Sequence, residues 1–284
     1  MSLIQVVALA IIQGFAELLP ISSSAHVVVA EKLMGLDPSA PALTLLLVLL
    51  HTGTMCAVIV YFWRQWRTSY FASHEAFKRI FWRVFIATAL TGAIGYGLAK
   101  LVVRLYLRST PNAPVERLFS HLGLIAPALF AVGVLIIVAY LLDKRVAKSQ
   151  SLTVRQSVVI GIVQGICLPF RGFSRSGATI SAGMLAGVQK SSAEAFSFAL
   201  AVVLTPPVVA REALRLRDHG PAMTPAQMHS IVSLDILGGA LAFLAGLLAL
   251  KWLSAWLERG RWYYFGAYCI VAAIAVELLH RAGF

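Results

Sequence analysis

Two polar segments that contain glycine and proline interrupt an otherwise strongly apolar sequence. The first covers residues 13–26 and reads QGFAELLPISSSAH, and the second covers residues 164–179 and reads QGICLPFRGFSRSGAT. Hydrocarbon does not tolerate unpaired polar groups or broken helices, so such segments persist in a membrane only where they are buried in protein or line a wet cavity. Ionisable side chains at membrane depth are therefore a functional-site hypothesis by default.

The composition places the chain in a membrane. Of its 284 residues, 59% are hydrophobic and only 13% are charged, whereas about a quarter of the residues of a soluble domain are charged. We therefore expect an all-α polytopic membrane protein that forms a single integral membrane domain over residues 1–284. The net charge of +12 does not indicate nucleic-acid binding, because the basic residues are scattered through short loops, which is typical of lipid-facing anchors.

The apolar stretches divide into full spans and broken segments. A spanning helix needs about 20 apolar residues, and we expect about six full transmembrane helices, at residues 42–63, 80–103, 119–142, 192–210, 231–256 and 262–281. The pair Pro206-Pro207 should end or kink the span that contains it. Segments 3–34 and 155–189 are instead expected to be broken re-entrant helix–loop–helix units, which enter and leave on the same side.

The two broken segments resemble each other at a fixed shift of 151 residues. Residues 11–14 (IIQG) align with residues 162–165 (IVQG), and Ser23 aligns with Ser174. Three full spans separate the two copies, so the second copy should enter from the opposite face. We expect an inverted-topology repeat, with halves of approximately 1–150 and 151–284 and a ligand site near the midplane.

Loop charges indicate the orientation. Loops 64–83, 143–155 and 257–261 carry more Lys and Arg than loops 100–117 and 211–217, and basic loops tend to stay cytoplasmic. This places both termini outside and opens the first broken segment toward the periplasm or the cell exterior.

The first polar segment has the residues of a phosphate site. Gln13 and Glu17 lie four residues apart and share one face of a helix. Pro20 suits the first turn of a new helix, and the serines at 22–24 can cap its free backbone N–H groups. A helix N-terminus with adjacent hydroxyls binds phosphate readily.

His26 adds an imidazole to this segment, on the same helical face as Ser22 and Ser23. Serines alone would favour a purely structural helix cap beside a histidine whose hydrogen bonds are all made within the protein. Because Glu17 and His26 stand beside them, a functional site is favoured.

The second polar segment supplies a cation. Arg175 is an expensive charge in a broken apolar run, and a guanidinium can bind two phosphate oxygens at once. The surrounding residues add hydroxyl donors and glycines that allow close backbone approach: Ser174, Ser176, Thr179, Gly172 and Gly177. Arg171 reads equally well as a further phosphate ligand and as a solvated loop residue.

Other polar residues within apolar stretches have weaker claims. For Asp235 and Glu277, structural pairing is favoured over catalysis. Glu194 lies near a helix start, where the helix dipole favours a carboxylate. His51 reads equally as a lining residue of the site and as a structural one. The cysteines have no metal-ligand spacing and read as buried free thiols: Cys56, Cys167 and Cys269.

Taken together, these motifs resemble the bacitracin-resistance family of undecaprenyl-diphosphate phosphatases. In that family a (Glu/Gln)-x-x-x-Glu motif leads into a Pro-x-Ser-Ser-x-x-His run, and a Pro-Gly-x-Ser-Arg-Ser-Gly-x-Thr motif lies in the second half. The matching residues are 13–26, 172–179, 51–54 (HTGT) and 262–266 (WYYFG), so the resemblance covers nearly the whole chain. Three positions depart from the pattern: Gln13 replaces the first glutamate, Arg171 replaces a proline, and Ala25 replaces a common glycine.

The resemblance implies hydrolysis of undecaprenyl diphosphate to undecaprenyl phosphate and inorganic phosphate. This reaction recycles the lipid carrier for peptidoglycan synthesis and confers bacitracin resistance. The enzyme would lie in the bacterial cytoplasmic (inner) membrane, with its active site facing the periplasm or cell exterior. Its partners would be the isoprenyl diphosphate lipid and membrane lipids, with no nucleic acid; a homodimer is one option for its assembly.

The predicted site has a catalytic part, a metal-binding part and a part that holds the diphosphate. Glu17, His26 and Ser23 are the expected catalytic residues. A divalent cation, Mg²⁺ or Ca²⁺, would bridge phosphate oxygens and Glu17, with Gln13 as a further ligand. The expected diphosphate-binding residues are Arg175, Ser174, Ser176, Thr179, Ser22 and Gly177.

Two alternatives stay open at the level of the sequence. The nucleophile is either Ser23, activated by Glu17 or His26, or His26 itself, which could also activate water. The function could instead be that of a polyprenyl-phosphate transporter or flippase that uses the same anion site, since inverted repeats and broken helices are transporter architecture. The enzyme is preferred because simple phosphate binding does not need the base chemistry of Glu17 and His26.

Overall fold

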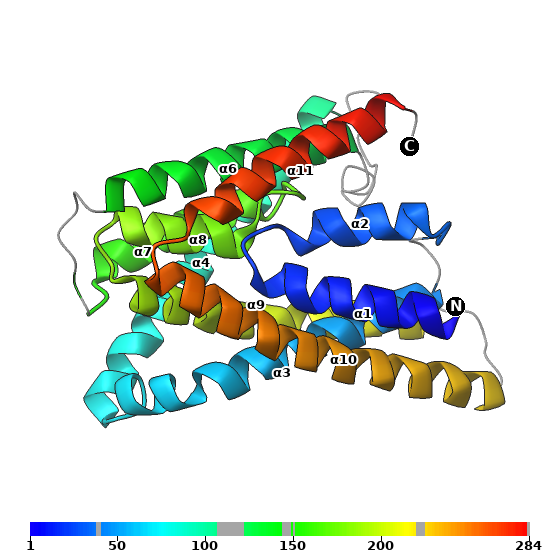
Figure 1. Cartoon of the computed structure of the whole chain (residues 1–284). Helices are drawn as coiled ribbons and strands as arrows, with labels where there is room; N and C mark the ends of the chain where they lie inside the picture. Colours follow the sequence, from blue (N-terminus) through cyan, green and yellow to red (C-terminus); the bar gives the residue numbers. More distant parts are fainter. Residues whose placement is uncertain (38–40, 107–121, 144–148, 150, 220–224, 283–284) are drawn as a thin grey trace.

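Helices make up almost all of the chain that the structure, a computed structural model, describes (Figure 1). The described residues are 1–37, 41–106, 122–143, 149, 151–219 and 225–282. The helices are α1 (Leu3–Leu18), α2 (Ser23–Leu33), α3 (Pro41–Ser69), α4 (His74–Tyr106), α6 (Leu122–Asp143), α7 (Val154–Cys167), α8 (Arg175–Leu185), α9 (Lys190–His219), α10 (Pro225–Glu258) and α11 (Tyr263–Arg281).

Six of these described helices are long and apolar enough to cross a membrane, which confirms the predicted class and the predicted number of full spans. The candidate spans are Leu43–Ser69, His74–Arg104, Gly123–Asp143, Lys190–Arg211, Val232–Glu258 and Tyr263–Arg281. They match the six predicted ranges to within several residues at most ends. Residues 119–121 of the predicted third span lie outside the described residues.

The proline pair in α9 does not end that helix. The helix continues from Lys190 through Pro206 and Pro207 to His219. Of the two predicted effects, an end of the helix is therefore wrong, and a kink stays a prediction. Proline fixes φ near the helical value and removes one N–H donor, so a helix can continue past it at a local cost.

The two polar segments form two helical hairpins. Helices α1 and α2 run antiparallel around the turn at residues 19–22, and α7 and α8 do the same around residues 168–174. Figure 1 shows that the two hairpins open toward opposite ends of the bundle and that their turns meet midway. The helix–break–helix form is as predicted, and their re-entry into a membrane stays a prediction.

The shift of 151 residues also relates caps and packing in the two hairpins. Ser2 caps α1 and Thr153 caps α7, each in a reciprocal capping box with a glutamine three residues later. The equivalent glycines Gly14 and Gly165 pack on α10 and α4, respectively. Each contacts equivalent positions of its partner helix: Ala242 and Ala245 for Gly14, and Thr91 and Ile94 for Gly165. The inversion across a membrane stays a prediction.

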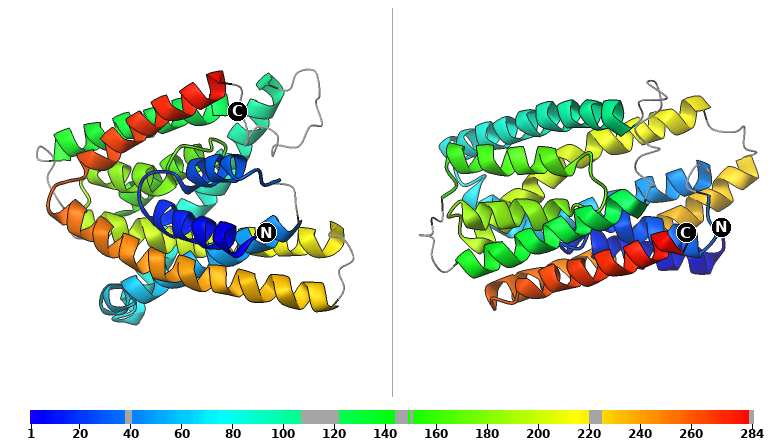
Figure 2. Two further views of the ribbon diagram at one scale, coloured as in Figure 1. Left: turned by 45° about the vertical axis from the view of Figure 1, so that its right-hand side comes forward. Right: turned by 90° about the horizontal axis from the view of Figure 1, so that it is seen from above.

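The connections that the sequence predicts to be cytoplasmic share one end of the bundle. The α3–α4 turn, the end of α6 and the α10–α11 turn lie together, while both termini lie at the opposite end (Figures 1 and 2). Most of the opposing loop, residues 107–117, is outside the described residues. Which end faces the cytoplasm stays a prediction.

The three cysteines are free thiols, as expected, but they are not all buried. Cys167 and Cys269 are buried, whereas Cys56 is exposed on α3. The expectation of burial is therefore wrong for Cys56, because an apolar neighbourhood in the sequence does not distinguish the lipid-facing side of a helix from its packed side.

The contact between α3 and α10 depends on glycine. A Cβ atom at Gly53 would overlap the backbone oxygen of Gly239, so the two helices could not keep their present separation. We expect Gly53→Ala to lower the stability by about 1–3 kcal/mol, the usual cost of overpacking, measured as a lower thermal unfolding temperature of the detergent-purified protein.

Gly97→Ala is the matched control for this substitution. Gly97 also lies inside a helix, α4, but a Cβ atom there would meet open space. Since alanine is the better helix former by about 1 kcal/mol, this variant should unfold at the same or a slightly higher temperature. Equal unfolding temperatures for the two variants would contradict the described α3–α10 packing.

Candidate active site

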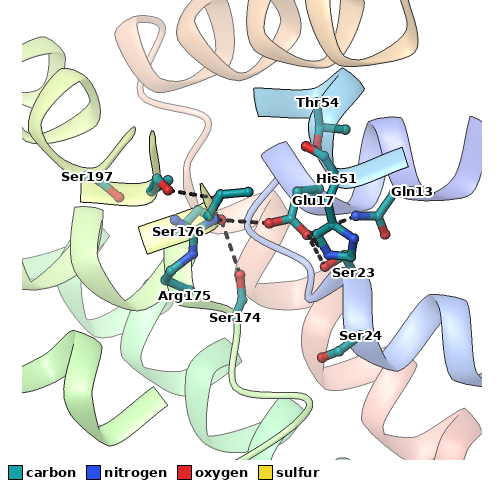
Figure 3. Close-up of polar contacts among 12 residues, drawn as sticks. Gln13, Glu17, Ser23, Ser24, His51, Thr54, Ser174, Arg175, Ser176 and Ser197 are labelled. Carbon is teal, nitrogen blue, oxygen red and sulfur yellow. Dashed lines mark hydrogen bonds and ion pairs between the residues drawn. The ribbon is translucent and has the colours of Figure 1, made fainter. Parts of the chain in front are cut away.

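Glu17, in the last turn of α1, lies where the two hairpin turns meet (Figure 3). Its Oε2 accepts hydrogen bonds from Ser23 Oγ at 2.5 Å and from Gln13 Nε2 at 3.2 Å. Its Oε1 accepts a hydrogen bond from a terminal guanidinium nitrogen of Arg175 at 3.0 Å. The predicted shared face of Gln13 and Glu17 is thus confirmed, and the two carboxylate oxygens face different partners.

Arg175 is the first residue of α8, and its ion pair with Glu17 joins the two hairpins. The side chains are only 22% and 16% exposed, respectively. Removing one partner of such a pair would leave a poorly solvated, unpaired charge, which is strongly unfavourable. The sequence predicted Arg175 as a ligand for phosphate. In this structure its guanidinium forms an ion pair with the carboxylate of Glu17.

The first turn differs from the expected serine cap. Helix α2 begins at Ser23, so Pro20 lies in the turn and not in a helix. Ser22, the N-cap residue, makes no side-chain cap, and its hydroxyl lies 3.3 Å from that of Ser24. Ser24 in turn accepts from the backbone N–H of Gly172 at 3.4 Å. The prediction of capping serines is wrong here, because other partners engage these hydroxyls.

The second turn does have a serine cap. Ser174 Oγ accepts from the backbone N–H of Gly177 at 3.2 Å. Ser176 Oγ donates to the carbonyl of Leu19 in the other hairpin at 3.3 Å. Thr179 donates to the carbonyl of Arg175 at 2.7 Å. The predicted phosphate donors therefore hold the turns in place in this structure, and their role toward phosphate stays a prediction.

Glycine allows the second turn to approach its neighbours closely. Gly172 has φ +99°, a conformation that favours glycine, and a Cβ there would lie 2.5 Å from the backbone oxygen of Ile125. A Cβ atom at Gly177 would lie 3.2 Å from Pro20 of the first turn, which is closer than most Cβ contacts in proteins. Both predicted glycines thus serve close contact between backbone segments.

The two ring nitrogens of His26 contact residues other than Ser23. Its Nδ1 lies 2.7 Å from the carbonyl oxygen of Ser22, and its Nε2 lies 2.7 Å from the hydroxyl of Tyr268 on α11. The group bonded to Ser23 is therefore Glu17 and not His26. The sequence analysis missed Tyr268, because a tyrosine in an apolar span ordinarily reads as a lipid-facing residue.

The structure brings His51 to the site. Its Nε2 lies 3.8 Å from Glu17 Oε2, and its Nδ1 lies 2.7 Å from the carbonyl oxygen of Leu47. Thr54, one turn later on α3, is buried and donates to the carbonyl of His51. Of the two readings that the sequence left open for His51, the structure supports the one in which it lines the site.

The remaining acidic residues lie elsewhere. Glu277 pairs with Arg281 at 2.8 Å, as expected for a structural role. Glu194 is buried near the start of α9 and accepts from Ser254 at 2.6 Å. Asp235 Oδ2 is buried without a hydrogen-bond partner in the described part of the chain, so the structure does not support the expected pairing for this oxygen.

A preformed metal cage is absent from the described residues. No group of three or more His, Cys, Asp or Glu side chains among them could hold a metal ion. Glu17 and Gln13 lie side by side, and the amide nitrogen of Gln13 donates to the carboxylate of Glu17. With that amide turned over, the carboxylate and the amide oxygen would fit Mg²⁺, which proteins commonly hold through one or two side chains and the oxygens of a bound phosphate.

Comparison with known proteins gives one consistent result. The family model described as "Bacitracin resistance protein BacA" matches residues 6–275. The protein named undecaprenyl-diphosphatase 2 of Acinetobacter baylyi is 53% identical over 273 residues, which cover 95% of this chain and 95% of that protein. The protein named undecaprenyl-diphosphatase 1 of Burkholderia pseudomallei is 34% identical over 289 residues, covering 96% and 95%. The chain therefore belongs to the bacitracin resistance protein BacA family.

Proposed function

We propose that this protein hydrolyses undecaprenyl diphosphate to undecaprenyl phosphate and inorganic phosphate. The observation that carries the proposal is the arrangement at Glu17, whose two oxygens contact a hydroxyl and a guanidinium separately. The near full-length similarity to proteins named undecaprenyl-diphosphatase supports it. The reaction recycles the lipid carrier of cell-wall synthesis, and bacitracin resistance is linked to the family.

Ser23 is the nucleophile in this proposal, with Glu17 as its base. The hydrogen bond of 2.5 Å from Ser23 Oγ to Glu17 Oε2 supports this assignment, since a nucleophilic hydroxyl needs an adjacent base. Both ring nitrogens of His26 have other partners in this structure, which disfavours its direct attack on phosphorus.

Arg175 and the start of α2 bind the diphosphate. Phosphate oxygens compete with the carboxylate of Glu17 for the guanidinium, which can bind two of them at once. The first turn of α2 has no side-chain cap from Ser22, so its N–H groups can face an anion. Positioning and charge neutralisation of this kind provide most of the catalysis in phosphoryl transfer.

The reaction proceeds through a phosphoserine. Ser23 Oγ forms a bond to the terminal phosphorus as its proton moves to Glu17 Oε2, and the bond from that phosphorus to the bridging oxygen breaks. Undecaprenyl phosphate leaves and takes the proton from Glu17. Water then attacks the phosphoserine and gives a proton to Glu17, which returns it to Ser23 Oγ as inorganic phosphate departs.

A divalent cation, held by Glu17 and Gln13 together with phosphate oxygens, would neutralise the charge of the diphosphate when bound. We further place the protein in the bacterial inner membrane, with the first hairpin open to the periplasm. The basic connections at the opposite end of the bundle support this orientation, since such loops tend to remain cytoplasmic.

Phosphate release from C55 isoprenyl diphosphate by the detergent-purified protein tests the assigned roles. Glu17→Gln should lower kcat by about 10²–10⁴-fold, the usual contribution of a general base, and Ser23→Ala should abolish turnover. Arg175→Lys should raise KM, because a single ammonium replaces a forked donor.

The control is Glu277→Gln, which changes a carboxylate of a candidate span in the same way. Glu277 pairs with exposed Arg281 and lies outside the site, so its activity should equal that of the wild type. A folded wild-type protein that binds the lipid diphosphate but releases no phosphate would refute the hydrolase and favour a polyprenyl-phosphate transporter.

Removal and restoration of Mg²⁺ tests the role of Gln13. A chelator should abolish phosphate release, and added Mg²⁺ should restore it. Gln13→Glu places a second carboxylate beside Glu17, so less Mg²⁺ should be required for half-maximal release. An unchanged half-maximal concentration would show that residue 13 does not contact the cation.

A further inference from the structure

We propose that Tyr268 is a positioning residue for this reaction, which acts through His26. Its hydroxyl lies 2.7 Å from His26 Nε2, and the two rings stack with centroids 5.6 Å apart. Tyr268 lies on α11, far from His26 in the sequence, and belongs to neither polar segment. This inference rests on the proposed function and assigns a role to a residue that the chemistry above does not use.

The partners of His26 determine where its proton lies. A carbonyl oxygen can only accept a hydrogen bond, so the 2.7 Å contact with the oxygen of Ser22 requires a proton on Nδ1. In the neutral imidazole, Nε2 then carries the lone pair and accepts from the hydroxyl of Tyr268. The pair therefore holds His26 with its basic nitrogen unprotonated and fixed in direction.

The Ser22 end of this chain of contacts is held by unusual backbone geometry. Ser22 is the only described non-glycine residue with a positive φ, at 70°. Its carbonyl accepts from both the Nδ1 and the backbone N–H of His26. Uncommon backbone conformations persist only where the surrounding structure imposes them, and they cluster at functional sites.

The Tyr268 end is held by the packing of α11. Cys269, the next residue, is fully buried, and its thiol donates to the carbonyl of Pro20 in the first turn at 3.3 Å. Three residues earlier, Gly266 packs so closely on α6 that a Cβ atom would lie 2.8 Å from the oxygen of Gly133. Consecutive residues of α11 thus contact the first turn and the start of α2, which sets the place of the phenol hydroxyl.

A role for this arrangement follows from the position of His26 on α2, one turn after Ser23. An imidazole with an unprotonated Nε2 can accept a hydrogen bond from the water that attacks the phosphoserine and so orient it, while the proton of that water passes to Glu17. Tyr268 occupies Nε2 in the absence of substrate and keeps the ring from rotating. Water or a phosphate hydroxyl then meets a ring that is already oriented. Without the phenol hydroxyl a smaller fraction of the rings has this orientation, which lowers kcat.

The test compares Tyr268→Phe with Tyr264→Phe in phosphate release from C55 isoprenyl diphosphate. Tyr268→Phe keeps the stacked ring and removes only the hydroxyl. A net hydrogen bond corresponds to about a three- to tenfold change in rate, so kcat should fall by that factor while KM stays within about twofold. Tyr264 lies one turn earlier on the same helix, with its ring tilted against that of Trp256, and Tyr264→Phe should match the wild type.

A second measurement does not depend on activity. Diethyl pyrocarbonate attacks unprotonated imidazole nitrogens, and mass spectrometry of the peptide that contains His26 gives the rate of modification. Loss of the phenol hydroxyl should expose Nε2 and raise this rate in Tyr268→Phe but not in Tyr264→Phe. A residue that only packs against His26 would leave the rate unchanged, because phenylalanine keeps the ring.

The outcomes separate this inference from the proposed function. An active wild type whose Tyr268→Phe variant has an unchanged or raised kcat overturns the role of Tyr268 and leaves the hydrolase standing. An unchanged rate of His26 modification overturns the hydrogen bond itself. A folded wild type that releases no phosphate refutes the hydrolase, and the inference falls with it.

Discussion

The contact between Glu17 and Arg175 is the interaction on which the rest of the site depends. It joins two hairpins that enter the bundle from opposite ends, and it does so where water is scarce. A lone charge at either position would be strongly disfavoured in such a place. The carboxylate therefore needs a cation on one oxygen, which leaves the other oxygen to Ser23. In the proposed reaction, a diphosphate that binds the guanidinium of Arg175 removes the cation from Glu17. The carboxylate of Glu17 then keeps its hydrogen bond with the Ser23 hydroxyl.

Rigid packing around the turns makes this arrangement precise enough for chemistry. The polar residues near the turns mostly bond to the opposite hairpin or to their own backbone, as Ser176 does with Leu19 and Ser24 with Gly172. Catalytic groups need supporting contacts of this kind to keep a productive geometry. Two short breaks in helices thus become a defined site because each break supports the other.

The sequence was sufficient to predict the helical framework and to select Glu17 and Arg175 as site residues, but not the ion pair between them. Long apolar runs form spanning helices, because a helix satisfies all its backbone hydrogen bonds internally. A charged residue such as Arg175 is costly to bury in an apolar run, which indicates a functional or pairing role. The direction of each hydroxyl could not be predicted, because a serine near a helix start can cap, bond across to another segment or face a ligand. Ser174 caps its helix, whereas Ser22 does not.

Tyr268 and His51 show a different limit of sequence analysis. Their roles depend on which side of a spanning helix faces the turns, and α11 and α3 are apolar all round. Where both the lipid and the protein interior are apolar, hydrophobic periodicity does not show which side of a helix faces the protein. Pro206-Pro207 shows the converse limit, because this strong local signal does not end the helix that contains it.

The bridge between hairpins also has a consequence for biosynthesis. Glu17 and Arg175 are 158 positions apart in the chain. At the usual pace of about 5–20 residues per second, the ribosome reaches the arginine codon roughly 8 to 32 seconds after the glutamate codon. During that interval the nascent first hairpin carries a carboxylate without its cation. The unpaired charge is strongly disfavoured away from water, so the site is complete only when the second hairpin has been made.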